Sequence, residues 1–372
     1  MTTEEPTSIS TPWRSNPRVM AERLGGWAAR TIGADATVVD VATPEGSGMS
    51  SETVLFSVRR GEAVERYVTR LAPAADAHFP VFPVYDLALQ RDVMRLVAAH
   101  TPVPVPRVAW YEPDPELLGS PFLVMHRVEG VVPSDIPPYP FGGWLADAPA
   151  PDRERLERAS VRALVGIHAV TPGTHDLAFL DPGRGPDHAG ASAMDRQLAY
   201  QRWYYDWARE GQTVHLVERS FAALEHTRPA EEPVPVLNWG DSRIGNVMYR
   251  DFEPVAVLDW EMATVGPAEV DVAWMSFLHR FFDDMTQRYG MPGMGEFLAL
   301  DRAARIYEEE GGRRLRDLDW YELYAALRFA IISVRTSLRT IAYGEAPAVD
   351  DLDDLIMFRP LLEDMLARAE SA

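Results

Sequence analysis

The chain has 372 residues, of which 47% are hydrophobic and 10% aromatic, so it is long enough for two or three domains with sizeable cores. Its formal net charge of −20 argues against nucleic-acid binding, which needs clustered cations, and favours attraction of a cationic substrate. Cysteine is absent and all 36 basic residues are arginine, which excludes disulfides, thiolate metal sites, Gly-Lys-Ser/Thr phosphate loops and lysine Schiff bases.

The first segment, MTTEEPTSISTPW, is polar and acidic and is typical of neither a signal peptide nor a transit peptide. No run approaches the roughly 18 apolar residues that a membrane-spanning helix requires. Together with the lack of cysteine, these features predict a cytoplasmic protein with no membrane partner and no nucleic-acid partner. The sequence does not indicate an oligomeric state.

Residues 1–128 are predicted to form a small N-lobe made of a sheet and two helices. Asn16 followed by Pro17 is typical of a helix N-terminus, and this helix is expected to reach Ile32. β-branched runs separated by turn residues predict three antiparallel strands, and an apolar stripe at helical spacing predicts a helix before two more strands. In chain order these segments are 37–44, 52–60, 65–73, 83–100, 106–112 and 121–130.

Residues 129–372 are predicted to form a mainly helical C-lobe, entered through a segment rich in proline and glycine. Helices are expected at 151–171, 192–210, 212–227, 268–289, 297–311, 318–344 and 349–370. The exception is 234–260, where VPVL, NVMYR and VAVLD predict short strands. The predicted class is therefore α+β, with a β-rich N-lobe, a helical C-lobe and a β-rich insert at their junction.

The insert carries the polar residues that phosphoryl transfer requires. Asp241 and Asn246 lie five residues apart on a loop between strands, and a predicted hairpin brings Asp259 back beside them. The reaction needs a carboxylate to accept the proton of the attacking hydroxyl, and oxygen ligands to hold Mg²⁺ against the phosphates. The spacing predicts Asp241 as the base and Asn246 and Asp259 as metal ligands.

The same segment resembles the aminoglycoside phosphotransferase family, whose signature is close to His-Gly-Asp-x4-Asn followed by Asp-Trp-Glu. GSGMSSETVLF resembles the loop that covers the phosphates in that family, and PFLVMHRVEG resembles the strand that leads to its interlobe hinge. The stretch from Trp239 to Trp274 is most similar to the actinobacterial branch. The resemblance implies a two-lobed, protein-kinase-like fold and a phosphotransferase that uses ATP and Mg²⁺ on a small hydroxylated acceptor.

The resemblance also implies roles for individual residues. Asp241 matches the catalytic aspartate of the family, and Asn246 and Asp259 match its magnesium ligands. Arg70 matches the cation that holds the α- and β-phosphates, and Asp92 stands where the family has a glutamate paired with that cation. The implied nucleotide site comprises the loop residues Gly48, Met49, Ser50 and Ser51, the pair Arg70 and Asp92, and the hinge residues Met125, His126 and Val128.

The clearest departure from the family signature is Trp239, which stands in the place of the histidine. That histidine serves as a scaffold for the catalytic loop. Tryptophan can fill the space and donate one hydrogen bond, but it cannot accept one. A nucleotide-binding pseudokinase without transfer activity is therefore the non-enzyme alternative.

The acceptor site is expected in the C-lobe, facing Asp241. Glu261, Glu269 and Asp271 follow the metal aspartate closely and could present negative charge to an amino sugar, although Asp271 is also placed to cap a helix. The acidic surface and the resemblance favour an aminoglycoside-like acceptor, as in antibiotic resistance. The enzyme alternative is a hydroxyacyl-CoA kinase, because relatives linked to acyl-CoA dehydrogenases share the arginine and the DWE sequence.

Overall fold

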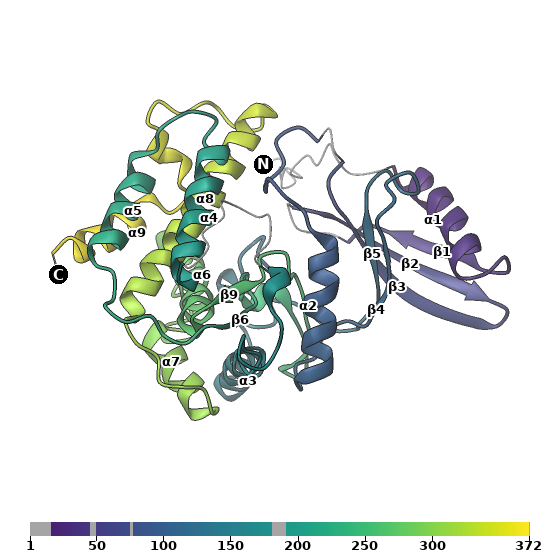
Figure 1. Cartoon of the computed structure of the whole chain (residues 1–372), viewed down its shortest axis with the longest axis horizontal. Coiled ribbons are helices and arrows are strands. Elements are labelled where there is room, and N and C mark those ends of the chain that lie inside the picture. The colour runs from purple at the N-terminus through teal and green to yellow at the C-terminus, as the bar shows by residue number, and fades with distance from the viewer. Residues whose placement is uncertain (1–15, 45–49, 75–76, 181–190, 372) are drawn as a thin grey trace.

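The computed structural model describes residues 16–44, 50–74, 77–180 and 191–371. They form two lobes, a smaller one on a five-stranded sheet and a larger one made mostly of helices (Figure 1). The predicted class, α+β with a β-rich N-lobe and a helical C-lobe, is confirmed. The division at residue 128 stays a prediction. Within the described ranges, no helix is both long and apolar enough to cross a membrane.

The elements of the N-lobe occur in the predicted order. They are α1 (Pro17–Thr31), β1 (Thr37–Ala42), β2 (Glu52–Arg60), β3 (Ala63–Leu71), α2 (Leu87–His100), β4 (Val108–Glu112) and β5 (Phe122–His126). The side chain of Asn16 caps α1 by accepting a hydrogen bond from the N–H of Arg18 at 3.0 Å. The strands pair antiparallel in the order β1-β2-β3-β5-β4, so β3 lies at the centre of the sheet.

The two faces of this sheet pack against different partners. Phe56 of β2 and Leu71 of β3 belong to a core with Trp27 of α1. Leu123 of β5 belongs instead to the core that continues through α2 into the C-lobe. Since successive strand residues point to opposite faces, Arg70 points away from the α1 core that Leu71 joins. Arg70 is therefore on the face from which it can reach the C-lobe.

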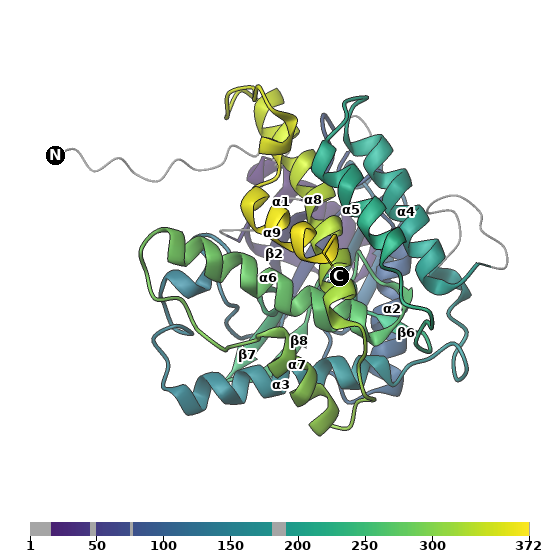
Figure 2. The same cartoon turned by 90° about the vertical axis from the view of Figure 1, so that its left-hand side faces the viewer.

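The C-lobe combines helices with two small two-stranded sheets. Its elements are η1 (Tyr139–Phe141), α3 (Ala150–His168), η2 (Ala178–Leu180), α4 (Ala193–Ala208), α5 (His215–His226), β6 (Val236–Asn238), η3 (Ile244–Asn246), β7 (Val247–Arg250), β8 (Glu253–Val257), β9 (Thr264–Gly266), α6 (Ala268–Arg288), α7 (Leu300–Glu309), α8 (Leu318–Ala342), η4 (Leu352–Leu355) and α9 (Arg359–Ala369). Strand β6 pairs with β9, and β7 pairs with β8. Helices α6 and α8 pack against each other in the middle of the lobe (Figure 2).

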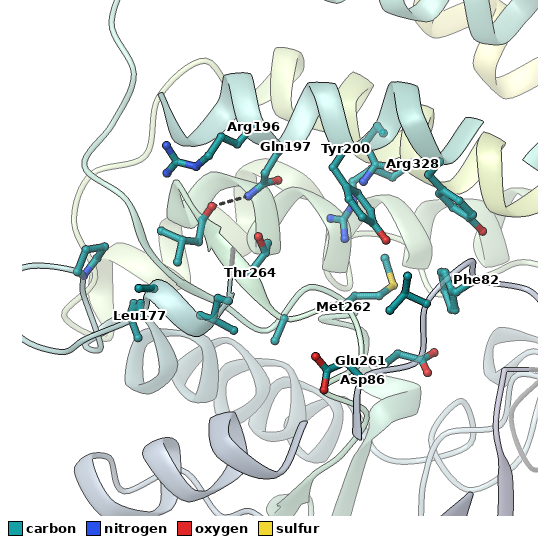
Figure 3. Close-up of a pocket in the computed structure, with 18 of the residues that line it drawn as sticks. Phe82, Asp86, Leu177, Arg196, Gln197, Tyr200, Glu261, Met262, Thr264 and Arg328 are labelled. Carbon is teal, nitrogen blue, oxygen red and sulfur yellow. Dashed lines mark hydrogen bonds between the residues drawn. The ribbon is translucent and has the colours of Figure 1, made fainter. Parts of the chain in front are cut away.

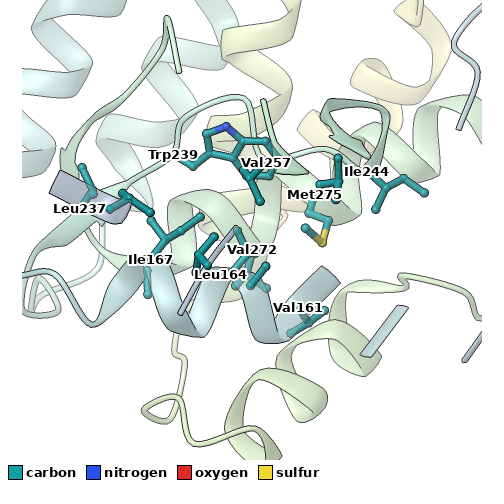
Figure 4. Packing of buried hydrophobic residues seen from close by; sticks show 14 of the residues in the cluster. Val161, Leu164, Ile167, Leu237, Trp239, Ile244, Val257, Val272 and Met275 are labelled. Carbon is teal, nitrogen blue, oxygen red and sulfur yellow. The ribbon is translucent and has the colours of Figure 1, made fainter. Parts of the chain in front are cut away.

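The catalytic insert rests on a buried apolar layer. In Figure 4, Trp239 lies over Leu164 and Ile167 of α3, with Val257 of β8 and Val272 of α6 beside it. These five side chains are at most 1% exposed. The loop that follows β6 is therefore built on rigid elements, which is where precise positioning of polar groups is least costly.

Two local predictions differ from the structure. The single helix expected over 349–370 is wrong, because a short 3-10 turn (η4) precedes α9. Pro360 occupies the first turn of α9, where a proline without an N–H is tolerated, whereas inside a longer helix it would remove a hydrogen bond. Strand β9 was not predicted, since its three residues are too few to show an alternating pattern.

Candidate active site between the lobes

The loop after β6 makes a close backbone contact at Gly240. This residue has a φ of +91°, and a Cβ there would lie 2.0 Å from the carbonyl oxygen of Met262. No other residue type fits without moving the backbone of the segment after Asp259. The glycine therefore lets the loop bearing Asp241 lie directly against the chain that carries the second half of the motif.

Asp271, in the first turn of α6, is hydrogen-bonded to the same loop. Its carboxylate accepts hydrogen bonds from the N–H of Trp239 at 2.7 Å and of Gly240 at 2.9 Å, and its backbone carbonyl accepts one from Ser242 Oγ at 2.8 Å. Nε2 of His168 lies 3.0 Å from it. Asp271 is fully buried, so it anchors the loop and the amino-sugar role suggested for it is wrong.

Glu269 is also fully buried and lies away from the predicted base. Its carboxylate accepts hydrogen bonds from the N–H of Arg316 at 3.3 Å and from the guanidinium of Arg313 at 3.5 Å. Burial raises the pKa of its carboxyl group, and these donors oppose that shift. Of the three acids proposed for the acceptor, Glu269 and Asp271 are thus structural, and only Glu261 reaches a cavity.

The carboxylate of Asp241, the predicted base, is held by three donors. Oδ1 accepts a hydrogen bond from Trp274 Nε1 at 2.8 Å, and Oδ2 accepts from Asn246 Nδ2 at 2.6 Å and from Arg243 Nε at 3.2 Å. Arg243 is itself paired with Asp135. Donors on both oxygens fix the plane of this carboxylate, and its side chain remains 15% exposed. The group is oriented and still accessible.

Asp259 is brought beside this loop by the β7–β8 hairpin, as predicted. The N–H of Leu258 donates to the carbonyl of Asn246 at 2.8 Å, which joins the end of the hairpin to its beginning. Trp239 Nε1 donates to the carbonyls of Leu258 at 2.8 Å and Asp259 at 3.0 Å. The indole therefore bridges the two halves of the motif with the single donor that a tryptophan possesses.

The oxygen atoms of Asn246 and Asp259 suit a magnesium ion. Asn246 donates from its Nδ2 to Asp241, which leaves its side-chain carbonyl oxygen available to a metal ion. Oδ1 of Asp259 is buried and has an ion pair with Arg70 but no hydrogen bond within the described ranges. Among the described residues, no three His, Cys, Asp or Glu side chains form a ready-made metal cluster. Mg²⁺ is commonly bound by one or two protein oxygens and completes its shell with phosphates and water, so the oxygens of Asn246 and Asp259 would be enough to hold it.

The predicted pair between Arg70 and Asp92 is wrong in this structure. Nη2 of Arg70 lies 2.9 Å from Oδ1 of Asp259 and 3.1 Å from Oε2 of Glu261. Asp92 instead pairs with its neighbour Arg91 at 2.7 Å, and the Asp92 side chain is 41% exposed. Aspartate is one methylene shorter than the glutamate expected there, and Glu261 offers Arg70 a buried partner from the other lobe.

Glu261 also contacts the phosphate-loop segment. Ser50 Oγ donates to its Oε2 at 3.0 Å, and both residues lie beside Arg70. Burial raises the pKa of Glu261 to about 8, and the negative charge of Asp259 adds to this effect against the charge of Arg70. Ser51 is buried, and its Oγ has no hydrogen-bond partner among the residues that the structure describes. Gly48 and Met49 of the predicted loop lie outside the described residues.

The predicted hinge residues lie at the end of β5. Met125 pairs with Val68 of β3, and the N–H of His126 donates to the carbonyl of Arg107 at 2.9 Å. Burial and the charge of Arg107 lower the pKa of His126. Val128 lies two residues after the end of β5 and is half-buried. The role of these three residues in binding the nucleotide stays a prediction.

A cavity of 370 Å³ opens next to Glu261, between the C-lobe and the segment before α2. In Figure 3, Arg196, Gln197, Tyr200 and Arg328 lie on one side of it, and Leu177, Asp86 and Glu261 lie on the other. Its walls come from the segment before α2, the segment before α4, helices α4 and α8, and the stretch from Glu261 to Val265. The size is in the usual range for a small-molecule site.

The fold and this constellation together define a two-lobed phosphotransferase. The family model described as phosphotransferase enzyme family matches residues 41–321, which is more than half of the chain. The protein therefore belongs to this family and is a small-molecule kinase by family.

Solved structures agree with the fold. A Ralstonia eutropha protein assigned as an aminoglycoside phosphotransferase superposes with a TM-score of 0.63 at 20% identity, covering 94% of this chain and 98% of its own. The aminoglycoside phosphotransferase APH(4)-Ia, in a ternary complex with ADP and hygromycin B, superposes with a TM-score of 0.57 at 16% identity, covering 94% and 99%. These likenesses establish the two-lobed kinase-like fold.

The curated relatives match this chain over only part of their own length. The probable acyl-CoA dehydrogenase IBR3 of Arabidopsis thaliana is 28% identical over 62% of this chain and 27% of its own. Acyl-CoA dehydrogenase family member 11 of Gallus gallus is 28% identical over 61% of this chain and 26% of its own. The chain thus spans about a quarter of the length of the curated relatives that it matches.

Trp274 and Arg328 were not predicted from the sequence. Both lie on long helices, where an aromatic or an arginine at a buried position carries no motif. Trp274 contacts Asp241, which lies 33 residues away in sequence, and Arg328 contacts Gly240, which lies 88 residues away. Only the packing of α6 against α8 brings them to the site.

Proposed function

We propose that this protein transfers the γ-phosphate of ATP to a hydroxyl group of a small molecule, with Asp241 as the base. The observation that carries the proposal is the double position of Glu261. It pairs with Arg70, the predicted phosphate-binding cation, and it also lines the cavity. A nucleotide phosphate on Arg70 and an acceptor in the cavity would therefore meet at Glu261, where the negative charge of Asp241 is felt.

The residues of the chain divide the work as follows. Asp241 accepts the proton of the attacking hydroxyl, and the three donors on its carboxylate keep it aimed without a change of side-chain conformation. Arg70 binds the phosphates once it leaves Asp259 and Glu261. Asn246 and Asp259 would hold Mg²⁺, which neutralises charge on the transferred phosphoryl group.

The acceptor binds in the 370 Å³ cavity. The carboxylates of Asp86, Asp176 and Glu261 line it and would suit the ammonium groups of an aminoglycoside-like acceptor. The ternary complex of a structural neighbour with hygromycin B supports this class of acceptor. However, Arg196 and Arg328 line the same cavity, so its charge is mixed.

The alternatives are less well supported. A hydroxyacyl-CoA kinase is not favoured, because the match with acyl-CoA dehydrogenase-type proteins spans about a quarter of their length. The pseudokinase alternative rests on Trp239 and Asp92. The indole donates to Leu258 and Asp259 and so can serve as the scaffold. Glu261 supplies the acidic partner of Arg70 that Asp92 does not.

The test is the variant Asp241→Asn. We expect phosphate transfer to fall at least about 100-fold, the usual contribution of a general base, with ATP affinity preserved. Transfer is measured as ADP release with Mg²⁺ over a panel of hydroxylated acceptors, and affinity by calorimetry. The matched control is Asp251→Asn, in the exposed β7–β8 turn, where a positive φ is tolerated by asparagine. Unchanged transfer by Asp241→Asn would refute the assignment of the base.

A further inference from the structure

Arg328 is a buried cation at the wall of the acceptor cavity. It lies in the middle of α8, is 3% exposed and lines the cavity. Figure 3 shows its side chain reaching from the helix toward the space between Tyr200 and Met262. A guanidinium remains charged in proteins, so a buried one needs partners to offset the loss of its hydration.

The structure supplies only part of these partners. Nη2 donates to the carbonyl of Gly240 at 2.8 Å, but Nε and Nη1 are buried and have no hydrogen-bond partner in the described part of the chain. Across the described ranges, no carboxylate forms an ion pair with Arg328. Arg335 on the same helix is equally buried but pairs with Glu210 at 2.6 Å and donates to the carbonyl of Pro80. Arg328 thus lacks the counterion that a second buried arginine of the same helix has.

The position of Arg328 relates it to the predicted base. Its guanidinium carbon lies 4.3 Å from the centre of the Trp274 ring, a cation–π contact that offsets some of the burial cost. Trp274 in turn donates to Asp241. An anion paired with Arg328 would therefore be connected through the Trp274 ring to Asp241, the proposed base.

We infer that the acceptor carries an anionic group, most simply a carboxylate, that pairs with Arg328 while its hydroxyl faces Asp241. This inference rests on the proposed transfer of phosphate to a small hydroxylated molecule, and it replaces the aminoglycoside-like acceptor with a hydroxylated acid or zwitterion. A purely cationic acceptor would leave Arg328 without a counterion. The apolar side chains of Phe82, Leu177 and Ile332, with the rings of Tyr200 and Tyr204, fit the body of such an acid. Charged Asp86 and Asp176 would accommodate an additional ammonium group.

The same charge could attract a phosphate of the nucleotide, so the experiment separates the two sources. Binding is measured by calorimetry with saturating Mg·ADP present, which occupies the nucleotide site. The probes are 4-hydroxybutanoate, 6-hydroxyhexanoate and 3-(hydroxymethyl)benzoate, each compared with its neutral primary amide. ADP release from ATP is then measured with the same six compounds.

The variant is Arg328→Met, with Arg328→Lys to keep the charge without the planar fork and Arg335→Met as a control for loss of a buried arginine from α8. We expect wild type and Arg335→Met to prefer a carboxylate over its amide by about 10- to 100-fold, the value of a hydrogen-bonded charge pair. Arg328→Met should lose this preference, and Arg328→Lys should keep part of it. ATP affinity should stay the same in all four proteins.

Three results would overturn the inference: an equal preference for acid and amide in wild type, a preference that survives in Arg328→Met, or a loss of ATP affinity in that variant instead. Failure of the proposed function is distinct. If carboxylates bind through Arg328 but no acceptor supports ADP release, the anion site stands and the transfer activity is refuted.

Discussion

The two sides of the active site differ in how their charged groups are held. On the acceptor side, Asp241 receives hydrogen bonds from helix α6 and from its own loop, and the loop backbone is bound by fully buried Asp271. On the nucleotide side, Arg70 of the N-lobe is paired with Asp259 and Glu261 of the C-lobe. The predicted base, Asp241, is thus held in place before any ligand binds. Arg70, which is predicted to bind the phosphates, is instead occupied by ion pairs with Asp259 and Glu261.

This difference indicates what nucleotide binding must change. Phosphates and Mg²⁺ would compete with the contacts between Arg70, Asp259 and Glu261, since the same atoms serve both purposes. The contacts around Asp241 need no rearrangement. Substitutions on the first side should therefore affect folding and transfer, and substitutions on the second side should affect nucleotide affinity.

The largest effect is expected for Asp271→Ala. The substitution leaves the buried N–H groups of Trp239 and Gly240 without an acceptor, which should lower the free energy of unfolding by about 3 to 5 kcal/mol. Chemical denaturation measures this change. Asp301→Ala is the control, because Asp301 also lies in the first turn of a helix but is exposed, and a loss below about 1 kcal/mol is expected there. Equal losses in both variants would mean that Asp271 acts only through its helix.

A smaller effect, on nucleotide affinity alone, is expected for Arg70→Met. Loss of the cation should weaken Mg·ATP binding by about 10- to 100-fold, since charge-assisted hydrogen bonds to phosphate are lost. Calorimetric titration gives the affinity. Asp92→Asn should bind ATP as wild type does, because Asp92 pairs with Arg91. A comparable weakening by Asp92→Asn would instead show that the pair with Arg70 forms when nucleotide binds.

The smallest effect is expected for Trp239→His, compared with Trp239→Phe. Phenylalanine removes the donor to Leu258 and Asp259, so the free energy of unfolding should fall by about 1 to 2 kcal/mol and transfer by less than about 10-fold. Histidine retains a donor and should recover part of the transfer rate. The control is Trp144→Phe, because Trp144 is exposed and its indole donates to the carbonyl of Val132, away from the catalytic motif. Complete loss of transfer in both Trp239 variants would give this residue a role beyond a scaffold.

The sequence by itself determined the fold class and the order of the elements. Period-two and helical spacings reflect which face each element buries, and that is a local property of the chain. The proximity of Asp241, Asn246 and Asp259 was also predictable, because a short hairpin joins them and fixes their separation. Where a local rule had few residues to act on, as in β9 or around Pro360, the prediction failed.

The tertiary structure alone decided which charged groups pair. Arg70 lies 191 residues from Glu261 in sequence, and Arg328 lies 88 residues from Gly240, so no spacing rule connects them. Asp92 followed the family pattern in position, but its shorter side chain pairs with the adjacent Arg91. Ion pairing depends on distance and burial in the folded chain, and both are set by how α6, α8 and the two lobes pack together.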